Sequence, residues 1–552
     1  MLRGIWEEIR GASRAVRGIG IRGTIERQLR RVRDRRDYQR WLRERDDSLP
    51  STAVVHDGRL VSVLMPTHDS DPRWLARAIE SVRAQTYANW EVCIADDASS
   101  RPGVREQIAA AARAEPRIHV VLRPDRGHIS AASNSALAIA RGEFVALLDH
   151  DDELAPQALG EVAALVRRYP DTDVAYSDED KIDLRGRRID AYFKPDFSPD
   201  LLLSQNLVSH LGLYRTSLVR DVGGFREGFE GSQDHDLALR VIERSSPDRV
   251  RHIPALLYHW RMTTRSTSGG LWRKDYAQEA GSRAIAEHLV RTGRRASVAC
   301  ASWSWFRVRY AMPDPRPSVT VVAVEPTVTG LHEALAGGDV ELTRVPARGS
   351  REGLADAINR AVRGSRGEVV VLLGPTCQPL PGWLEELVAQ ASRAEVGVAG
   401  GKVLSKDRRI LHAGYLLALD RDSPVVDAHR GLPDGALGHF GRADLVQNFL
   451  AVGPDCLAIR REVFDSLDGL DAAAFPSHLF SVDLCLRARE KGLRVLFTPY
   501  ARVVQRSPAQ DRAGDARERA RLASAWGERV PLDPYWHPAL DRSSGSFRLS
   551  GS

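Results

Sequence analysis

Cysteine is scarce in this chain: there are five among 552 residues, and no two of them have the CxxC spacing. Single cysteines far apart in the sequence form neither a zinc ribbon nor a dense disulfide framework. We therefore expect no structural zinc and no disulfide bonds. This cysteine usage is typical of proteins that reside in a reducing compartment.

Long apolar runs are missing as well. No stretch approaches the ~18 consecutive apolar residues that a transmembrane helix needs, and the first residues lack the continuous apolar segment of a signal peptide. These absences predict a cytoplasmic protein. Contact with the inner face of the plasma membrane stays open, because residues 1–50 are rich in arginine and weakly amphipathic. A solvated helix face explains that pattern equally well.

The overall composition is that of a globular protein, with 43% hydrophobic and 28% charged residues. At ~150 residues per domain, the chain length predicts two or three domains. The net charge of +6 is concentrated towards the N-terminus rather than spread evenly. A basic stretch can meet an anionic lipid or an acidic partner; we expect no nucleic-acid partner.

Strand and helix patterns alternate from residue 58 onward. Short apolar strands are predicted at 60–65, 90–95, 118–122 and 144–148, with helical patterns at 74–85, 108–114 and 130–140 between them. Short apolar runs flanked by helices are typical of buried parallel strands. The order predicts an α/β fold with a doubly wound, mostly parallel sheet.

The second half of the chain repeats the first. Residues 134–148 and 359–373 each end in Arg-Gly-Glu followed by an apolar strand, at identical spacing. The helix that begins near Asp236 returns near Asp483 with the same pattern. This self-similarity predicts a duplicated domain whose second copy is shorter. The expected parts are a basic helical segment (1–50), a first domain (58–310), a second domain (318–505) and a tail (506–552).

An acidic turn follows the predicted strand at 144–148. Asp149, Asp151 and Asp152 lie within four residues of one another, and their charges repel unless a cation offsets them. Hard carboxylate oxygens favour Mg²⁺ or Mn²⁺. The alternative is an acidic surface turn without a metal ion.

Three further sites carry polar side chains at the ends of predicted strands or the start of a helix. Pro66-Thr67 and Asp96-Asp97 could cradle a base, ribose or phosphate, or could simply form turns and helix caps. Asp234 could act as a general base that takes a proton from an acceptor hydroxyl, or could cap the helix that follows.

His259 and Arg261 lie near a segment rich in Thr, Ser and Gly. A neutral imidazole can bind a transition metal, although a lone histidine on a strand is more often a core residue. Residues 262–270, together with Arg261, could form a lid that closes over a diphosphate.

Together these motifs resemble glycosyltransferase family 2, whose members have the GT-A fold. The matching pieces are Val61–Thr67, Asp96–Ser99, Gly127–Asn134, Leu148–Asp152, Gly223–Phe225 and Gln233–Asp234. The longer strings Tyr176–Lys181 and Lys194–Asp200 are similar to a bacterial branch associated with O-antigen and other cell-surface polysaccharides.

The resemblance implies an inverting glycosyltransferase that moves a sugar from a nucleotide-diphosphate donor to a hydroxyl of a glycan or lipid-linked glycan. It implies Asp234 as the catalytic base, and Asp149, Asp151 and His259 as the site of Mn²⁺ or Mg²⁺, with Asp151 favoured for direct contact. The positions that match donor-binding residues are Pro66, Thr67, Asp96, Asp97, Asn134, Asp149 and Arg261. Gln233 departs from the family, in which many members carry Glu.

The second domain lacks these groups. Self-comparison places Thr376, Ser481 and Gln505 where the first domain has Asp151, Asp234 and His259. We therefore expect the second domain to be non-catalytic, with a scaffold, acceptor-docking or dimerisation role.

Two other functions stay open. One is a non-catalytic nucleotide-sugar-binding scaffold of a polysaccharide assembly complex. The other is a nucleotidyltransferase, which would carry a glycine-rich, lysine-bearing loop in place of residues 66–68.

Overall fold

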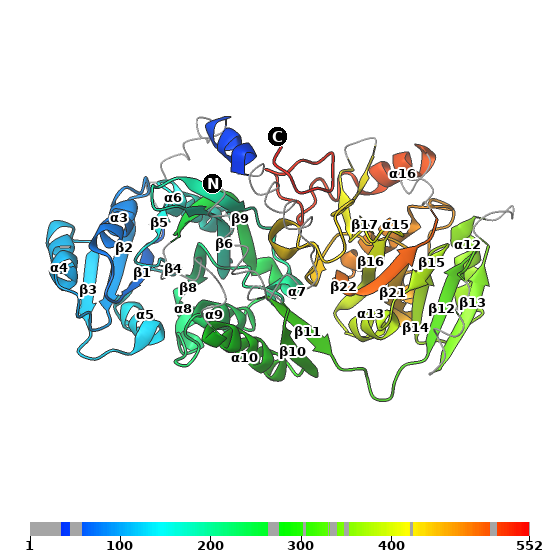
Figure 1. Cartoon of the computed structure of the whole chain (residues 1–552), viewed down its shortest axis with the longest axis horizontal. Helices are drawn as coiled ribbons and strands as arrows, with labels where there is room; N and C mark the ends of the chain where they lie inside the picture. The colour runs from blue at the N-terminus through cyan, green and yellow to red at the C-terminus, as the bar shows by residue number, and fades with distance from the viewer. Residues whose placement is uncertain are drawn as a thin grey trace.

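The computed structural model describes residues 35–44, 58–262, 275–301, 305–328, 331, 339–346, 353–419, 423–507 and 516–550. Figure 1 shows two α/β lobes side by side, with the first half of the chain in one and the second half in the other. The predicted α/β class and the two related domains are confirmed. Apart from Met262, the predicted lid lies outside the described residues, as does most of the basic segment 1–50.

The first domain is built on a nine-stranded mixed sheet in the order β3-β2-β1-β4-β8-β6-β9-β5, with β7 paired to β6. Its strands are β1 (Val61–Thr67), β2 (Trp90–Asp96), β3 (Ile118–Leu122), β4 (Phe144–Leu147), β5 (Glu153–Leu154), β6 (Val174–Ile182), β7 (Arg188–Tyr192), β8 (Gly212–Arg215) and β9 (Val250–Arg261). The pairs among β3, β2, β1 and β4 are parallel, whereas β8 runs antiparallel between β4 and β6. Strand β9 then pairs in parallel with β6.

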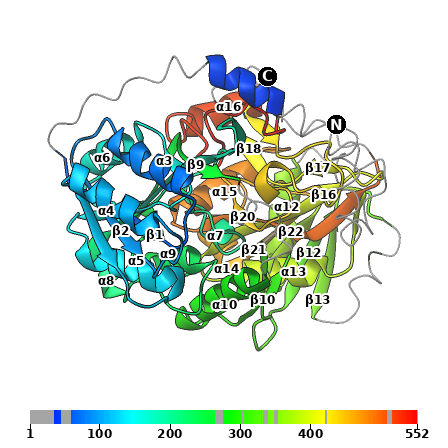
Figure 2. The same ribbon diagram turned by 60° about the vertical axis from the view of Figure 1, so that its left-hand side comes forward.

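Helices cover both faces of this sheet (Figure 2). They are α3 (Pro72–Arg83), α4 (Val104–Ala114), α5 (His128–Ile139), α6 (Ala158–Arg168), α7 (Pro199–Leu202), α8 (Thr216–Asp221), α9 (Gln233–Ile242) and α10 (Asp275–Arg291), with a 3₁₀ helix η3 (Pro247–Arg249). Helix α3 begins where the Asp71 side chain accepts a hydrogen bond from the Arg73 N–H and Pro72 opens the first turn. Because helices lie on both sides, β1 and β2 are buried along almost their whole length.

The parallel strands bring their carboxyl ends to one edge of the sheet. Thr67 of β1 pairs with Asp96 of β2, and Leu64 pairs with Leu147 of β4. The loops that follow β1, β2 and β4 therefore start side by side. This is the edge at which open α/β sheets bind their ligands.

The second domain is also built on a nine-stranded sheet, whose main path repeats that of the first without a counterpart of β3 in the described part of the chain. Its order is β13-β12-β14-β21-β16-β22-β15, which matches β2-β1-β4-β8-β6-β9-β5, and within the described residues no strand takes the place of β3. The strands are β12 (Val319–Val324), β13 (Val340–Val345), β14 (Val369–Leu373), β15 (Cys377–Pro379), β16 (Val396–Leu404), β17 (Ile410–His412), β20 (Gln447–Asn448), β21 (Cys456–Arg460) and β22 (Arg494–Gln505). The helices are α12 (Leu354–Arg363), α13 (Trp383–Ala391), α14 (Arg461–Ser466) and α15 (Phe480–Glu490), with the 3₁₀ helix η6 (His439–Gly441).

Matching hydrogen bonds support the duplication at the level of single residues. The Asn134 side chain donates to the Phe225 carbonyl at 2.7 Å and accepts from the Phe225 N–H at 2.8 Å. In the second domain, Asn359 makes the same two bonds to Leu470, at 2.8 and 2.9 Å. Because the asparagine bonds its helix to the same turn in both domains, its role in them is structural.

A second repeated pair fixes the alignment of the two domains near the predicted base. Arg240 donates to Asp236 at 2.9 Å, and Arg487 donates to Asp483 at 2.7 Å. Both pairs span one turn of the corresponding helix, α9 or α15. Counting two residues back places Ser481 at the position of Asp234.

Buried polar contacts join the two domains. Arg393 of the second domain donates to Asp200 at 2.6 Å, and Asn448 donates to the other oxygen of Asp200 at 2.8 Å. The hairpin of β10 (Ala296–Cys300) and β11 (Phe306–Tyr310) also reaches the second domain, where Arg307 donates to Glu386 at 2.9 Å. Since these charged groups are paired and largely buried, they favour one relative position of the domains.

The two ends of the described chain lie over the seam between the lobes (Figure 1). The helix at residues 35–44 contacts the first domain through Tyr38, whose hydroxyl donates to Asp180. Residues 516–550 contain α16 (Ala516–Trp526) and a coil that contacts both domains. In the coil, Asp533 accepts a hydrogen bond from the Leu417 N–H at 2.8 Å, beside the small sheet of β18 (Tyr415–Leu417) and β19 (Val425–Asp427).

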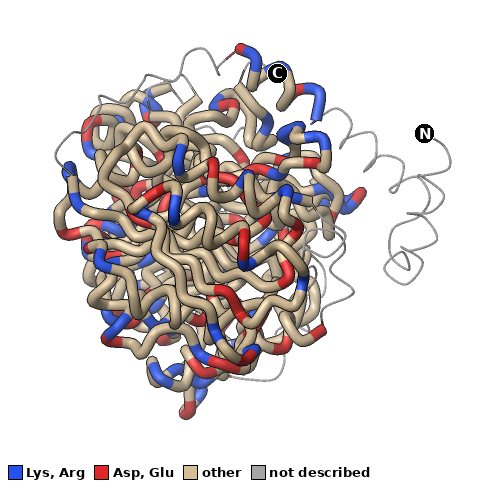
Figure 3. The backbone as a smooth tube through the Cα atoms, turned by 90° about the vertical axis from the view of Figure 1, so that its left-hand side faces the viewer, with Lys and Arg blue, Asp and Glu red and all other residues tan. Residues whose placement is uncertain are grey.

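Along the backbone of the first domain, Lys and Arg positions are interspersed with Asp and Glu positions on the side seen in Figure 3. This face therefore does not present a field of one sign. Among the described residues, no helix is both long and apolar enough to span a bilayer.

Candidate active site

A pocket opens at the edge of the first sheet where β1 and β4 end. It is lined by residues from these two strands, from α5 and α9, and from the segment that leads into β8: Leu64, Pro66, Ile129, Ser133, Leu147, Leu148, Asp149, Ser209, His210, Gly212, Tyr214, Phe225, Gln233, Asp234 and Tyr258. The acidic turn after β4 and the first turn of α9 thus meet at one pocket. Asp149 and Asp234, which are far apart in the sequence, both line it.

A larger cavity of about 480 Å³ lies elsewhere, between the helix at 35–44 and the β6–β7 hairpin. Its charged side chains are paired, because Arg187 donates to Asp183 at 2.8 Å and Arg35 contacts Asp190 at 3.4 Å. It contains no cluster of carboxylates at a strand end. The smaller pocket beside Asp149 is therefore the better candidate for chemistry.

Tyr258 of β9 holds the acidic turn in place. Its hydroxyl donates to Asp152 at 2.6 Å and accepts from the Asp149 N–H at 3.2 Å. The other oxygen of Asp152 accepts from the Arg261 N–H at 2.7 Å. Asp152 thus attaches the turn to β9 through both of its carboxylate oxygens. The carboxylates of Asp149 and Asp151 do not take part in this attachment.

The carboxylates of this turn crowd negative charge into a buried place. Burial raises the pKa of Asp149; His210 opposes that shift, and the charges of Asp151 and Asp234 add to it. Burial also raises the pKa of Asp152, with further increases from Asp151 and Asp149. A bound cation would offset this repulsion. Within the described residues, no protein group forms a hydrogen bond or ion pair with the Asp151 carboxylate.

His259 lies next to the same turn. The antiparallel pairing of β5 and β9 sets it opposite Glu153. Its Nδ1 lies 2.6 Å from an oxygen of Asp180, which also accepts from Arg188 at 2.6 Å. A carboxylate on one ring nitrogen is typical of histidines whose other nitrogen binds a metal.

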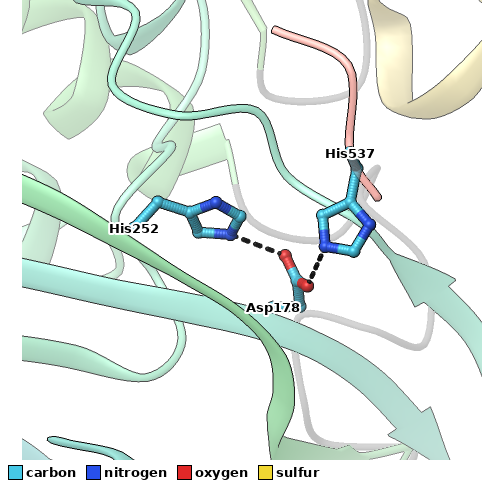
Figure 4. Close-up of side chains that lie close together, drawn as sticks. All are labelled: Asp178, His252 and His537. Atoms are coloured by element: carbon cyan, nitrogen blue, oxygen red, sulfur yellow. Dashed lines mark hydrogen bonds and ion pairs between the residues drawn. The ribbon is translucent and has the colours of Figure 1, made fainter. Parts of the chain in front are cut away.

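The described residues bring one group of three ligands within metal-binding distance, and it differs from the predicted one. The ligand atoms of Asp178, His252 and His537 all lie within 4.8 Å of one another, so this group could hold a metal ion. Figure 4 shows both histidines pointing at Asp178, at N···O distances of 2.9 and 2.7 Å. The ligand atoms of Asp149, Asp151 and His259 do not gather as closely in the described structure.

The two histidines of the Asp178 cluster differ in their contacts. His252 has a carboxylate at each ring nitrogen: Asp178 at 2.9 Å and Asp196 at 3.1 Å. Nδ1 of His537 accepts from the Ala539 N–H at 3.0 Å, whereas its Nε2 lies 2.7 Å from Oδ2 of Asp178 without forming a hydrogen bond. A metal ion there would have to replace the hydrogen bond between His252 and Asp178. No sequence motif pointed to this cluster, because His537 reaches it from the tail.

Asp234 lies in the first turn of α9, where a negative charge is favoured by the helix dipole. Asn206 donates to its Oδ2 at 2.7 Å. Among the described residues, no protein donor contacts its Oδ1. Sequence patterns did not point to Asn206 or to His210, because neither belongs to a recognisable motif. His210 is the pocket residue that lowers the pKa of Asp149.

Asp96 ends β2 and Asp97 follows it; of these two, only Asp97 keeps an oxygen without a partner in the described part of the chain. Its Oδ1 accepts from Arg123 at 2.9 Å and from the Gly127 N–H at 2.8 Å, whereas its Oδ2 is buried and unpaired. Asp96 has both oxygens occupied: Oδ1 accepts from the Ser99 hydroxyl at 2.5 Å, and Oδ2 accepts from Arg105 at 2.8 Å. Buried polar atoms are normally paired, so Oδ2 of Asp97 is a natural partner for a ligand.

Two residues assigned to donor binding by resemblance are bonded elsewhere in the protein. Both ends of the Asn134 amide are taken by Phe225, as described above. Arg261 donates to the Asp151 carbonyl at 2.8 Å and to Glu153, and its guanidinium lies over the Trp74 ring. Neither residue lines the pocket; the same holds for Thr67, Asp96, Asp97, Asp151 and His259. Arg261 braces the acidic turn from the β9 side.

The equivalent position in the second domain is filled by protein. Gly374 stands where Asp149 stands, as the pairing of β14 with β21 shows. A Cβ at Gly374 would collide with the Asp455 carboxylate. Ser481, the counterpart of Asp234, is completely buried. Among the described residues of the second domain, no acidic pair like Asp149 and Asp234 forms here.

Comparison with known proteins agrees with this architecture. The family described as "Glycosyl transferase family 2" matches residues 62–223, and "Glycosyltransferase like family 2" matches residues 310–525. An uncharacterised protein, y4gI of Sinorhizobium fredii, is 39% identical over 90% of this chain and 59% of its own length. The O-antigen biosynthesis protein RfbC of Myxococcus xanthus is 33% identical over 91% of this chain and 42% of its own length.

The chain thus spans about half the length of these two relatives. A chondroitin synthase of Escherichia coli is 28% identical over 42% of this chain and 33% of its own length. Among solved structures, residues 1–349 of S. aureus TarS in complex with UDP-GlcNAc align with a TM-score of 0.35 and 21% identity, over 42% of this chain and 66% of that chain. The matches to both halves show that the chain belongs to glycosyltransferase family 2 and carries two domains of that family.

Proposed function

We propose that this chain is an inverting, metal-dependent glycosyltransferase that moves a sugar from a nucleotide-diphosphate donor to a hydroxyl acceptor. The observation that carries the proposal is that Asp234 and Asp149, the first acid of the turn after β4, line one pocket at the carboxyl edge of the first sheet. Such a transfer needs a general base for the acceptor hydroxyl and a group that stabilises the departing diphosphate. Asp234 is placed for the first role, and the carboxylates of the turn could hold a metal ion for the second.

Asp234 is the proposed catalytic base. Asn206 holds its Oδ2, so its Oδ1 is the oxygen that accepts the proton of the acceptor hydroxyl. As that hydroxyl attacks the anomeric carbon, the bond to the diphosphate breaks on the opposite face of the sugar. A single displacement of this kind inverts the anomeric configuration.

The nucleotide is proposed to bind beside β1 and β2. Asp97 is 2% exposed, and Arg123 and Gly127 fix its Oδ1, so its unpaired Oδ2 can accept an N–H or O–H from a base or ribose. Pro66 lines the pocket on the same side, and Thr67 follows it at the end of β1.

Asp149, Asp151 and His259 are the residues that would hold the metal ion. Their chemistry suits such an ion, although their ligand atoms do not gather as closely as those of the Asp178 cluster. Asp151 has no protein partner among the described residues, the turn concentrates negative charge, and Asp180 holds Nδ1 of His259 so that Nε2 remains for a ligand. When bound, Mn²⁺ or Mg²⁺ supplies Lewis-acid stabilisation of charge on the departing diphosphate.

The biological role that we propose is the synthesis of a cell-surface polysaccharide on the cytoplasmic side of the membrane. The relatives named for O-antigen and chondroitin synthesis support a glycan or lipid-linked glycan as the acceptor. Arg393 and Asn448 anchor the second domain to the first, which supports a scaffold role for it.

The test is transfer and donor hydrolysis with a panel of nucleotide sugars, comparing wild type with Asp234→Asn. Because a placed general base contributes roughly 10²–10⁴ in rate, we expect Asp234→Asn to lower kcat at least ~100-fold while donor binding stays intact. Ser481→Ala, at the equivalent position of the second domain, is the control and should leave kcat unchanged. An unaffected Asp234→Asn enzyme, or donor binding without any turnover in wild type, would contradict the proposal.

A further inference from the structure

Lys194 is a completely buried cation in the first domain, and the proposed chemistry does not use it. Its ammonium group donates to the His210 carbonyl at 2.9 Å, to Glu179 at 3.3 Å and to the Ser209 carbonyl. Burying a charged lysine is costly unless its hydrogen bonds are satisfied. Two of its partners are backbone carbonyls of the segment that leads into β8.

Glu179 holds the same segment from the other side. Its Oε2, which accepts from Lys194, also accepts from the His210 N–H at 2.7 Å. Both polar groups of the His210 backbone are therefore fixed by one buried ion pair. Neither Lys194 nor Glu179 lines the pocket, so any effect on the reaction must pass through this segment.

The held segment, residues 206–210, connects the two acidic parts of the pocket. At one end Asn206 donates to Asp234 at 2.7 Å. At the other end the His210 ring stacks on Tyr258, with centroids 4.7 Å apart, and Tyr258 in turn holds the acidic turn through Asp149 and Asp152. A displacement of the segment would move both ends.

We propose that Lys194 and Glu179 are positioning residues, whose buried ion pair fixes segment 206–210 so that Asn206 presents Asp234 to the acceptor while His210 stays beside Asp149. This inference rests on the proposed function of Asp234.

The second domain shows that the fold alone does not require this ion pair. Strand β16 takes the place of β6, with Ala175 and Ala399 pairing alike with their neighbouring strands. Counting four residues along from there, buried Val403 stands where Glu179 stands. The domain without an acidic pocket therefore has an apolar residue in place of this carboxylate.

The experiment compares Lys194→Met and Glu179→Gln with wild type in steady-state transfer. Because the base matters in the transition state, we expect kcat to fall at least ~10-fold while the donor KM stays within ~3-fold. Lys402→Met is the matched control: Lys402 is an equally buried lysine of the second domain, 3.1 Å from Asp444. It should lower the thermal unfolding midpoint like Lys194→Met yet leave kcat unchanged.

A double-mutant cycle with Asn206→Ala separates positioning from a loss of stability. If Lys194 acts through Asn206, Lys194→Met should lower kcat less than ~2-fold in the Asn206→Ala background. Full additivity, or a Lys194→Met enzyme that changes only its unfolding midpoint, would overturn the inference and leave the proposed function standing. A wild-type protein without transfer activity would overturn both.

Discussion

At the scale of single residues, the carboxylates of the site fall into two groups. In one group both oxygens are bonded within the protein, and in the other one oxygen remains for a ligand. Asp96 and Asp152 have both oxygens bonded within the chain, whereas Asp97 and Asp234 each keep one oxygen without a partner among the residues that the structure describes. The division follows from neighbours that the folded chain supplies. It is a sharper guide to ligand binding than the position of an acid in a motif.

Asp97→Asn tests this division at the nucleotide site. An amide can still accept at Oδ1, but it places an N–H₂ group where the unpaired oxygen was, so a donor group of the nucleotide loses its acceptor. The loss of one such hydrogen bond costs about 1–3 kcal/mol, so we expect the donor KM to rise roughly 10-fold or more. Asp125→Asn, at an exposed position nearby, is the control. An unchanged donor KM would remove Asp97 from the binding site.

Much of the site could be predicted from sequence at this scale, and part of it could not. Asp149, Asp151 and Asp234 stand in patterns at strand ends or helix starts, so their residue types and positions already predict chemistry. Asn206 and His210 belong to a segment without periodicity or motif, and they matter only because the fold places them between the acids. The family resemblance suggested Asn134 as a donor-binding residue, and the structure bonds both ends of its amide to Phe225.

At the scale of elements, parallel strands, local helices and their order followed from hydrophobic patterning. The strands β1 to β4 and helices α3 to α5 lie within a few residues of the predicted ranges. The antiparallel insertion of β8 between β4 and β6 has no local signal, because strand pairing over such sequence distances depends on the whole sheet. The tail contact of His537 is another long-range feature of this kind.

The contact of the tail with β6 and β9 predicts a pH dependence of stability. The charge of Asp178, with help from Asp196, raises the pKa of His252 in spite of its burial, and His537 and His252 lower the pKa of Asp178. A histidine whose pKa is raised by folding stabilises the folded state at pH values below its pKa in the unfolded chain, ~6.5. This stabilisation is lost as the pH rises through the pKa of the folded state. A lowered aspartate pKa stabilises above ~3.9 and is lost on acidification.

We therefore expect the contribution of the cluster to be greatest between about pH 4 and 6.5. Between pH 6 and pH 9, the thermal unfolding midpoint of wild type should fall more than that of His252→Gln, since roughly 2–4 °C accompanies each kcal/mol in domains of this size. Equal pH profiles for the two proteins would show that His252 carries no such charge in the folded state.

At the scale of the whole molecule, the chain contains two domains of the same fold that differ in the residues at the carboxyl edge of the sheet. The second domain keeps the strand order of the first apart from β3. It also keeps the hydrogen bonds of Asn359 to Leu470 and the ion pair of Arg487 with Asp483, which match those of Asn134 and Arg240. It has Gly374 and Ser481 in place of Asp149 and Asp234, with Asp455 filling the space beside Gly374. The features that the two domains share therefore belong to the fold, and those that they do not share point to the chemistry of the first.

The central claim is that a divalent cation belongs at the acidic turn that faces Asp234. Its most direct test is the anomalous scattering of Mn²⁺ in crystals grown with a nucleoside diphosphate. We predict a peak beside Asp151 and Asp149, within the pocket that Asp234 lines, and its loss in Asp151→Asn. A Mn²⁺ peak at Asp178, His252 and His537 with none at the acidic turn would contradict the account.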